Sequence, residues 1–144
     1  MIKKIQTRNL YMGRLPYGSD LLEEMTKICQ NEDIRLGKIE ALGAVQRASI
    51  GFYDQKSRQY QFHQLDRPLE IAGLVGNVSI KDDKPFVHAH ITLSDETGRA
   101  YGGHLAAGTV VFACEITITV FDGPAFERDF DQETGLPLWT MLET

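Results

Sequence analysis

The stretch HAHITLSDETGRAYGGH, residues 88–104, holds three of the four histidines of the chain and predicts a β-hairpin. At its start, Val87, Ala89 and Ile91 alternate with His88 and His90. Successive residues of a β-strand point to opposite faces of the sheet. The alternation therefore predicts that the apolar side chains enter the core and that both histidines project from the other face.

The turn in the middle of this stretch predicts where the third histidine lies. The sequence Asp-Glu-Thr-Gly at 95–98 fits a type I turn that ends with a glycine in the left-handed conformation. Such a three-residue hairpin loop pairs Asp95 with Arg99, and counting back along the strands pairs His90 with His104. Directly paired residues point the same way, so this register brings all three histidines to one face. A four-residue loop, or a bulge at the glycine pair before His104, would send that side chain elsewhere.

Three imidazoles on one face indicate a metal site. His88, His90 and His104 would leave a fourth position open around a zinc ion, which lowers the pKa of a bound water to roughly 7 or polarises a carbonyl oxygen. The alternative is a half-exposed strand face on which the histidines are incidental. His63 lies apart from the cluster in the sequence and is interpreted as a surface or interface residue.

The rest of the chain predicts an α+β fold in a single domain, residues 1–144. Residues 17–34 place apolar side chains at helical spacing, with Ser19 or Asp20 able to cap the start. From residue 34 onward, β-branched and alternating runs are separated by turn residues, which favours an antiparallel sheet. We therefore expect a mainly antiparallel β-sheet with one main N-terminal helix and short flanking helical segments. The apolar positions of the expected helix are Leu21, Leu22, Met25, Ile28 and Cys29.

Composition and charge disfavour several classes of protein. No run of about 18 apolar residues is present, so no transmembrane helix is predicted, and the first residues lack the apolar segment of a secretory signal. The net charge of −5, with Lys and Arg scattered along the chain, disfavours binding to nucleic acid. Cys29 and Cys114 lie in apolar patterns and are interpreted as small buried residues of a reducing cytoplasm. In the less regular tail, we expect Phe126, Phe130 and Trp139 to dock on the body or on a neighbour.

The chain resembles the PPC domain, the plant and prokaryote conserved domain, over nearly its whole length. The likeness is carried by the segments RLPYGSDLLEEM, IEALGAV, RPLEIAGLVGNVSI, HAHITLSDETGRAYGGHL and ACEITITV. The resemblance implies an antiparallel sheet with flanking helices, assembled as a homotrimer. It also implies zinc binding, because prokaryotic members of this type carry an H-x-H and a following Gly-Gly-His, which correspond here to His88, His90 and His104. In plants the domain follows an AT-hook, an Arg-Gly-Arg-Pro element that this sequence lacks.

A more distant similarity is to acetolactate decarboxylase, a zinc enzyme with an H-x-H and a third histidine on a related sheet. This similarity implies a site that polarises a carbonyl group with the help of nearby glutamates and an arginine. Glu115 and Glu70 each lie within an otherwise apolar strand and are the candidate catalytic carboxylates. The alternative for each is a salt bridge or a subunit contact with an arginine such as Arg14 or Arg47.

Residues and resemblance together predict a cytoplasmic homotrimer that binds zinc and a small oxygen-bearing ligand at His88, His90 and His104. Turnover of the ligand is left open; the chemistry in that case would be zinc-dependent carbonyl polarisation or hydrolysis. One alternative is a DNA-binding or DNA-associated regulatory module, as in the plant proteins. Another is a trimeric interaction scaffold whose histidines are incidental.

Overall fold

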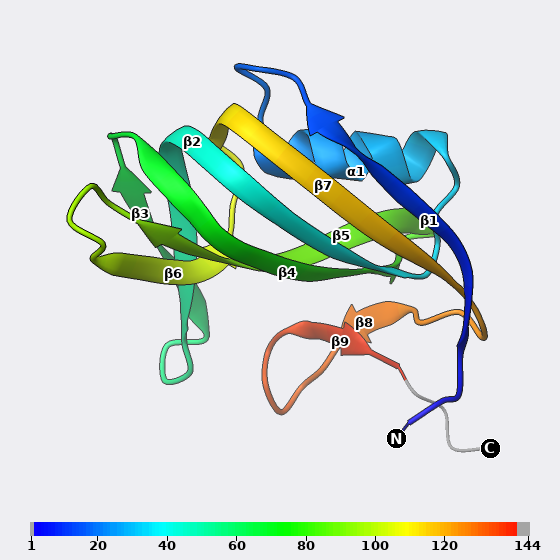
Figure 1. Ribbon diagram of the computed structural model, residues 1–144. Coiled ribbons are helices and arrows are strands. Elements are labelled where there is room, and N and C mark those ends of the chain that lie inside the picture. Colours follow the sequence, from blue (N-terminus) through cyan, green and yellow to red (C-terminus); the bar gives the residue numbers. More distant parts are fainter. Residues whose placement is uncertain (1, 141–144) are drawn as a thin grey trace.

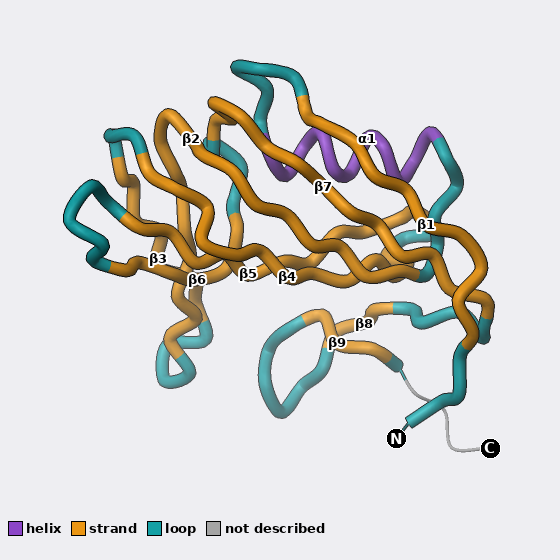
Figure 2. The backbone as a smooth tube through the Cα atoms, in the orientation of Figure 1, coloured by secondary structure: helices purple, strands orange, loops and turns teal. Residues whose placement is uncertain are grey.

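The computed structural model describes residues 2–140. It consists of a long, curved antiparallel sheet with a helix on one face and a small two-stranded sheet near the other (Figure 1). Figure 2 shows that strands make up most of the backbone. The elements in chain order are β1 (Gln6–Leu15), α1 (Leu21–Asn31), β2 (Gly37–Asp54), β3 (Gln59–Leu65), β4 (Leu69–Lys81), β5 (Lys84–Ser94), β6 (Ala100–Leu105), β7 (Val110–Asp122), β8 (Arg128–Phe130) and β9 (Pro137–Trp139).

The long strand β2 organises the main sheet. The strands follow the order β1-β7-β2-β4-β5-β6, and β3 pairs with β2. The first part of β2, which is 18 residues long in total, pairs with β4 and β7, whereas its last part pairs with β3 and β6. The strands β2, β4, β5 and β6 therefore form a closed ring of pairings, which curls this end of the sheet.

The predicted α+β class, mainly antiparallel with an N-terminal helix, is confirmed, but the predicted short flanking helical segments are wrong. The connections from β2 to β7 hold five residues at most, which is too short for a stable helix. After β7, the chain passes through Gly123 and Pro124 and returns through Gly135 and Pro137. Glycine and proline disfavour helix, so this part of the described chain forms the hairpin β8–β9 instead.

The helix α1 covers one face of the sheet. Asp20, one of the two predicted caps, accepts hydrogen bonds from two backbone N–H groups of the first turn. Leu21, Met25 and Cys29 are fully buried, and burial of a leucine or methionine side chain stabilises the fold by roughly 1.5–3 kcal/mol. Cys29 and Cys114 are both buried with free thiols, as their apolar surroundings in the sequence predict. At 11 residues, the one helix of the described chain is too short to cross a membrane.

The opposite face of the sheet, which we call the open face, carries exposed apolar side chains. Leu10, Met12, Leu42 and Val75 are between 58 and 77% exposed. They lie at outward positions of β1, β2 and β4, and polar and charged side chains lie between them on the same face: Lys38, Glu40, Glu115 and Thr117. Large exposed apolar side chains gathered on one face in this way are typical of a surface that another protein covers.

The hairpin β8–β9, which we call the tail hairpin, lies on the side of the open face (Figure 1). Phe126 is buried, and the ring of Trp139 packs edge-on against it with 5.0 Å between the ring centroids. The expected docking therefore holds for these two aromatic residues. Phe130 is 66% exposed and does not dock on the described chain.

The hairpin between β5 and β6 has the predicted turn and register. The N–H of Asp95 donates to the carbonyl oxygen of Arg99 at 3.1 Å, and Gly98 has a φ of +80°. The pairing continues without a shift up to His90 opposite His104. The three-residue loop inferred from the sequence is therefore confirmed.

The carboxylate of Asp95 stabilises this turn. It accepts hydrogen bonds from the hydroxyl and N–H of Thr97, the N–H of Arg99 and the hydroxyl of Tyr101, at 2.7–3.1 Å. These bonds, led by the one from the Thr97 hydroxyl, favour the ionised form and lower the pKa of Asp95 to about 2. One side chain thus links two residues of the turn with Tyr101 of β6.

Replacing Asp95 with alanine should lower the melting temperature by several degrees, because four hydrogen bonds to the carboxylate are lost. The amides of β6 should also exchange with solvent faster. Thermal unfolding and hydrogen exchange measure both effects. Glu96→Ala in the same turn is the control, because Glu96 is exposed and should tolerate the change. Wild-type stability and exchange in Asp95→Ala would contradict this account of the turn.

Candidate metal centre

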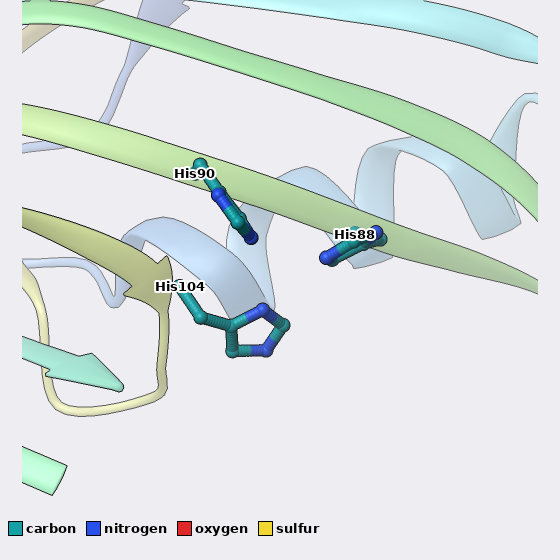
Figure 3. Close-up of side chains that lie close together, drawn as sticks. All are labelled: His88, His90 and His104. Atoms are coloured by element: carbon teal, nitrogen blue, oxygen red, sulfur yellow. The ribbon is translucent and has the colours of Figure 1, made fainter. Parts of the chain in front are cut away.

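Strands β5 and β6 bring three imidazoles together. His88 and His90 come from β5, and His104 comes from β6 directly opposite His90. Figure 3 shows the three side chains turned toward one another. Their ring centroids lie 5.1–5.7 Å apart. One ligand nitrogen from each residue lies within 4.8 Å of the other two, so the three could hold a single ion.

Two glycines allow β6 to approach β2 closely beside the cluster. His104 is paired with Gly51 of β2 as well as with β5. A Cβ atom at Gly103 would lie 2.6 Å from the carbonyl oxygen of Gly51, so this position requires glycine. The sequence left open whether the pair Gly102-Gly103 gives room or a bulge. The structure shows that it gives room, and His104 keeps the face shared with His90.

Burial favours the neutral, metal-binding form of His88 and His104. The pKa of His88 falls to about 4, first because burial removes water from the ring and then because His104 and Arg128 lie nearby. The pKa of His104 is lowered mainly by burial as well. The Nδ1 atom of His104 is buried and has no hydrogen-bond partner in the described chain. Buried polar atoms nearly always have a partner, and a metal ion would provide one.

An aromatic pair from the β2–β3 hairpin flanks His104. The ring of Tyr60 lies 4.9 Å from that of His104, and Phe62 stacks on Tyr60 at 5.7 Å with an angle of 20° between the rings. The alternating sequence placed Tyr60 and Phe62 on one face, but it gave no sign that this face turns toward the histidines. His63 is exposed on the same strand and lies outside the cluster, as predicted.

Arg128 is a residue of the site that the sequence did not reveal. It lies on β8, and its guanidinium donates hydrogen bonds to Ser79 and Asn77 of β4 and to the carbonyl oxygen of Pro137. Asn77 is paired with His88 across β4 and β5, so the guanidinium lies beside the cluster. The tail has no periodic pattern from which this placement could be read, because only the docking of the tail hairpin brings Arg128 here.

Neither candidate catalytic carboxylate reaches the histidines within one chain. Glu115 is exposed on β7, directly opposite Arg14 of β1, and β2 and β4 separate it from β5 by roughly 14 Å. Glu70 is exposed on β4 opposite Ser94, roughly 15 Å along the strand from the residue that pairs with His90. The pairing of Glu115 with Arg14 agrees with the alternative, non-catalytic role. The catalytic roles of both glutamates stay predictions.

The donor set fits a divalent transition metal. Imidazole nitrogens suit zinc and its neighbours in the first row, whereas magnesium and calcium prefer oxygen ligands. Three protein ligands leave a position free for water or for a ligand, as in zinc sites that support chemistry. Around the cluster, Arg128 offers a positive charge and Tyr60 an aromatic surface.

Comparison with known proteins shows which of them share this sequence and fold. The model of the Plants and Prokaryotes Conserved (PCC) domain matches residues 3–122. Among solved structures, a metal-containing protein from Archaeoglobus fulgidus is 42% identical, with a TM-score of 0.93 over 98% of this chain and 99% of that one. A plant- and prokaryote-conserved (PPC) protein from Pyrococcus horikoshii is 34% identical, with a TM-score of 0.92 over 100% of both chains.

Further comparisons concern longer or more distant proteins. The chain is 30% identical to the bifunctional protein GlmU of a Synechococcus species over 129 residues, which span 88% of this chain but only 19% of that protein. A candidate DNA-binding protein from Ralstonia eutropha is 30% identical, with a TM-score of 0.82 over 92% of this chain and 91% of that one. Acetolactate decarboxylase from Bacillus subtilis shares the fold alone, at 15% identity and a TM-score of 0.55 over 86% of this chain and 56% of that one. The expected distant similarity is thereby confirmed.

Metal-free protein should lose stability as the pH falls from about 6.5 toward 4. The pKa of His88 is about 4 in the folded state and has the ordinary value of 6.5 in the unfolded chain. Between these values the unfolded state binds more protons, so the free energy of unfolding decreases with falling pH, by about 2 to 3 kcal/mol in total. Denaturant unfolding of chelator-treated protein at about pH 7 and about pH 4 measures the loss.

His88→Asn should remove a large part of this pH dependence, because the titrating group is gone. His63→Asn is the control and should keep the wild-type dependence, since His63 is exposed on β3. An unchanged pH dependence in His88→Asn would contradict the lowered pKa of His88.

Proposed function

The chain belongs to the Plants and Prokaryotes Conserved (PCC) domain family, and we propose that it is a metal-binding member in which His88, His90 and His104 hold one zinc ion. The hairpin register carries this proposal, because it brings one nitrogen of each histidine within 4.8 Å of the others. Incidental surface histidines would give no reason for the buried, unpartnered Nδ1 of His104. The relative from Archaeoglobus fulgidus, described as metal-containing, adds support.

The ligand that we propose for this site is a small molecule that offers an oxygen atom. Zinc, when bound, would polarise a carbonyl oxygen or activate a water molecule, so the reactions that the site suits are carbonyl chemistry and hydrolysis. Burial keeps His88 and His104 neutral, so neither has to release a proton before it binds the metal near neutral pH. The ring of Tyr60 covers one side of His104, and the ring of Phe62 stacks on Tyr60.

We also propose that other copies of this chain cover the open face in a homotrimer, the assembly that the resemblance implies. The exposed apolar side chains of Leu10, Met12, Leu42 and Val75 support this assembly, because burying such side chains stabilises association. Val75 is paired directly with His90, so a subunit on this face would also shield the histidine cluster.

DNA binding is the second candidate function, and the relative from Ralstonia eutropha is the observation that favours it. The net charge of −5 weighs against it. DNA affinity that falls steeply with rising salt concentration would support this candidate over a small-ligand site.

Protein purified without a histidine tag should contain about one zinc ion per chain. His104→Ala should weaken zinc binding by at least about 100-fold, roughly 3 kcal/mol, because one of three ligands is removed. Elemental analysis gives the metal content, and competition with a chromophoric chelator gives the affinity.

His63→Ala is the matched control for this measurement, because it removes an exposed histidine outside the cluster. It should bind zinc as the wild type does. Equal zinc affinity in His104→Ala and wild type would favour the scaffold with incidental histidines. A wild type that lacks metal and gains no thermal stability from added zinc would do the same.

Leu42→Glu should convert the homotrimer to monomers, because it replaces an apolar side chain of the open face with a negative charge directly opposite Glu115. Sedimentation equilibrium measures the mass of the assembly. Gln30→Glu adds the same charge at an exposed position of α1 and should leave the mass unchanged. A monomeric wild type, or a Leu42→Glu variant that keeps the trimer mass, would contradict the proposed interface.

A further inference from the structure

Arg128 carries a positive charge that no acidic residue of the described chain neutralises. Its guanidinium is half-buried, and its hydrogen bonds go to neutral acceptors: Oγ of Ser79 at 2.8 Å, Oδ1 of Asn77 at 2.9 Å and the carbonyl oxygen of Pro137 at 3.0 Å. Within residues 2–140, no carboxylate oxygen lies within 4.0 Å of it. A partly buried charge without a counter-ion is unfavourable, so a built arrangement of this kind indicates a missing partner.

The guanidinium lies beside the histidine cluster on the open face. Asn77 is paired with His88, and Ser79 is paired with Phe86, across β4 and β5. Directly paired side chains point the same way, so a group that bonds to both Asn77 and Ser79 lies next to His88. The charge of Arg128 is accordingly one of the causes of the low pKa of His88. The proposed metal and the guanidinium therefore face the same small region.

The hydrogen bonds already made leave Arg128 with a free pair of donors. A guanidinium has five N–H groups, and the bonds to Ser79, Asn77 and Pro137 use one on Nε and one on each terminal nitrogen. One N–H therefore remains on each terminal nitrogen. Arginine binds a carboxylate through two parallel hydrogen bonds of this kind. The rings of Phe86 and Trp139, centred 5.4 and 5.5 Å from the guanidinium carbon, restrict its movement.

An anion between these groups would compensate the charge of Arg128 and reduce its repulsion with a bound metal ion. A divalent ion on the three histidines and the guanidinium of Arg128 repel each other across a partly buried site. A ligand could relieve this repulsion if its negative group bonded to Arg128 and its neighbouring oxygen coordinated the metal. Because the guanidinium and His88 are held by adjacent strands, the two groups of the ligand have to be close together.

We propose that Arg128 binds the carboxylate of the ligand, and that the ligand is a small carboxylic acid with a carbonyl or hydroxyl oxygen beside the carboxylate. This inference rests on the proposed metal site, which it deepens by naming the class of ligand. Arg128 then selects the ligand, and the histidines hold the metal that receives its second oxygen.

The test uses pyruvate and its neutral methyl ester as probes, with cobalt(II) in place of zinc so that binding at the metal changes the visible spectrum. Pyruvate should bind wild-type protein at least about tenfold more tightly than the ester, roughly 1.4 kcal/mol. Arg128→Gln should take up cobalt like the wild type and lose this preference. Equal binding of the two probes by the wild type, or a preference that survives in Arg128→Gln, overturns the proposal. Tighter binding of inorganic phosphate than of pyruvate overturns the assignment to a carboxylate.

Arg58→Gln is the matched control. Arg58 also ties the tail to the sheet, through the carbonyl oxygens of Gln132 and Glu133 at 3.1 and 3.2 Å, and it makes no hydrogen bond to β4 within the described residues. This variant should keep the preference for pyruvate. Loss of the preference in Arg58→Gln as well would show that docking of the tail is what matters, and would overturn the role of Arg128.

Pyruvate is also added to metal-free protein, with the melting temperature as the readout, to separate this proposal from the metal site. An Arg128-dependent rise in melting temperature, in a protein that takes up no cobalt, would support the anion site and overturn the metal site. Uptake of cobalt without an Arg128-dependent response to pyruvate would overturn the anion site and leave the metal site standing.

Discussion

The pairing of β5 with β6 is the constraint on which the candidate site depends. The Asp95 turn sets this pairing, and the pairing places His104 opposite His90. A shift of one residue would turn His104 to the other face, because side chains alternate along a strand. The same pairing completes the ring of strands β2, β4, β5 and β6, so the register that gathers the metal ligands is also the one that closes the sheet.

The two faces of the sheet have different roles. The face under α1 supplies the core, whereas the open face collects functional groups from distant parts of the chain. The histidines come from β5 and β6, Tyr60 comes from the β2–β3 hairpin, and Arg128 comes from the tail hairpin. The end of β2 pairs with both β3 and β6, which brings Tyr60 to His104. Hydrogen bonds from Arg128 to β4 attach the tail hairpin.

The sequence alone predicted the parts of the site whose positions depend on residues close together in the chain. Strand alternation and turn chemistry place His88, His90 and His104 on one face, because both act over a few residues. Tyr60 and Arg128 were not predictable, since their positions follow from the course of β2 and from the docking of an irregular tail. The glutamates illustrate another limit: Glu115 and Glu70 lie in apolar strands, yet both are exposed, because the outward positions of those strands are open. The expected short flanking helical segments do not form within the described residues from β2 to β7, because the connections there are too short.

The close approach of β6 to β2 at Gly103 and Gly51 couples the position of His104 to the closure of the sheet. A Cβ at Gly103 would collide with the Gly51 carbonyl, and one at Gly51 would press on the rings of Tyr60 and Phe62 at 3.1 Å. A larger residue at Gly103 would push β6 off β2 and carry His104 with it, whereas at Gly51 the rings of Tyr60 and Phe62 would have to move. A descendant that replaces Gly103 therefore disrupts the histidine cluster and the closure of the sheet in the same event.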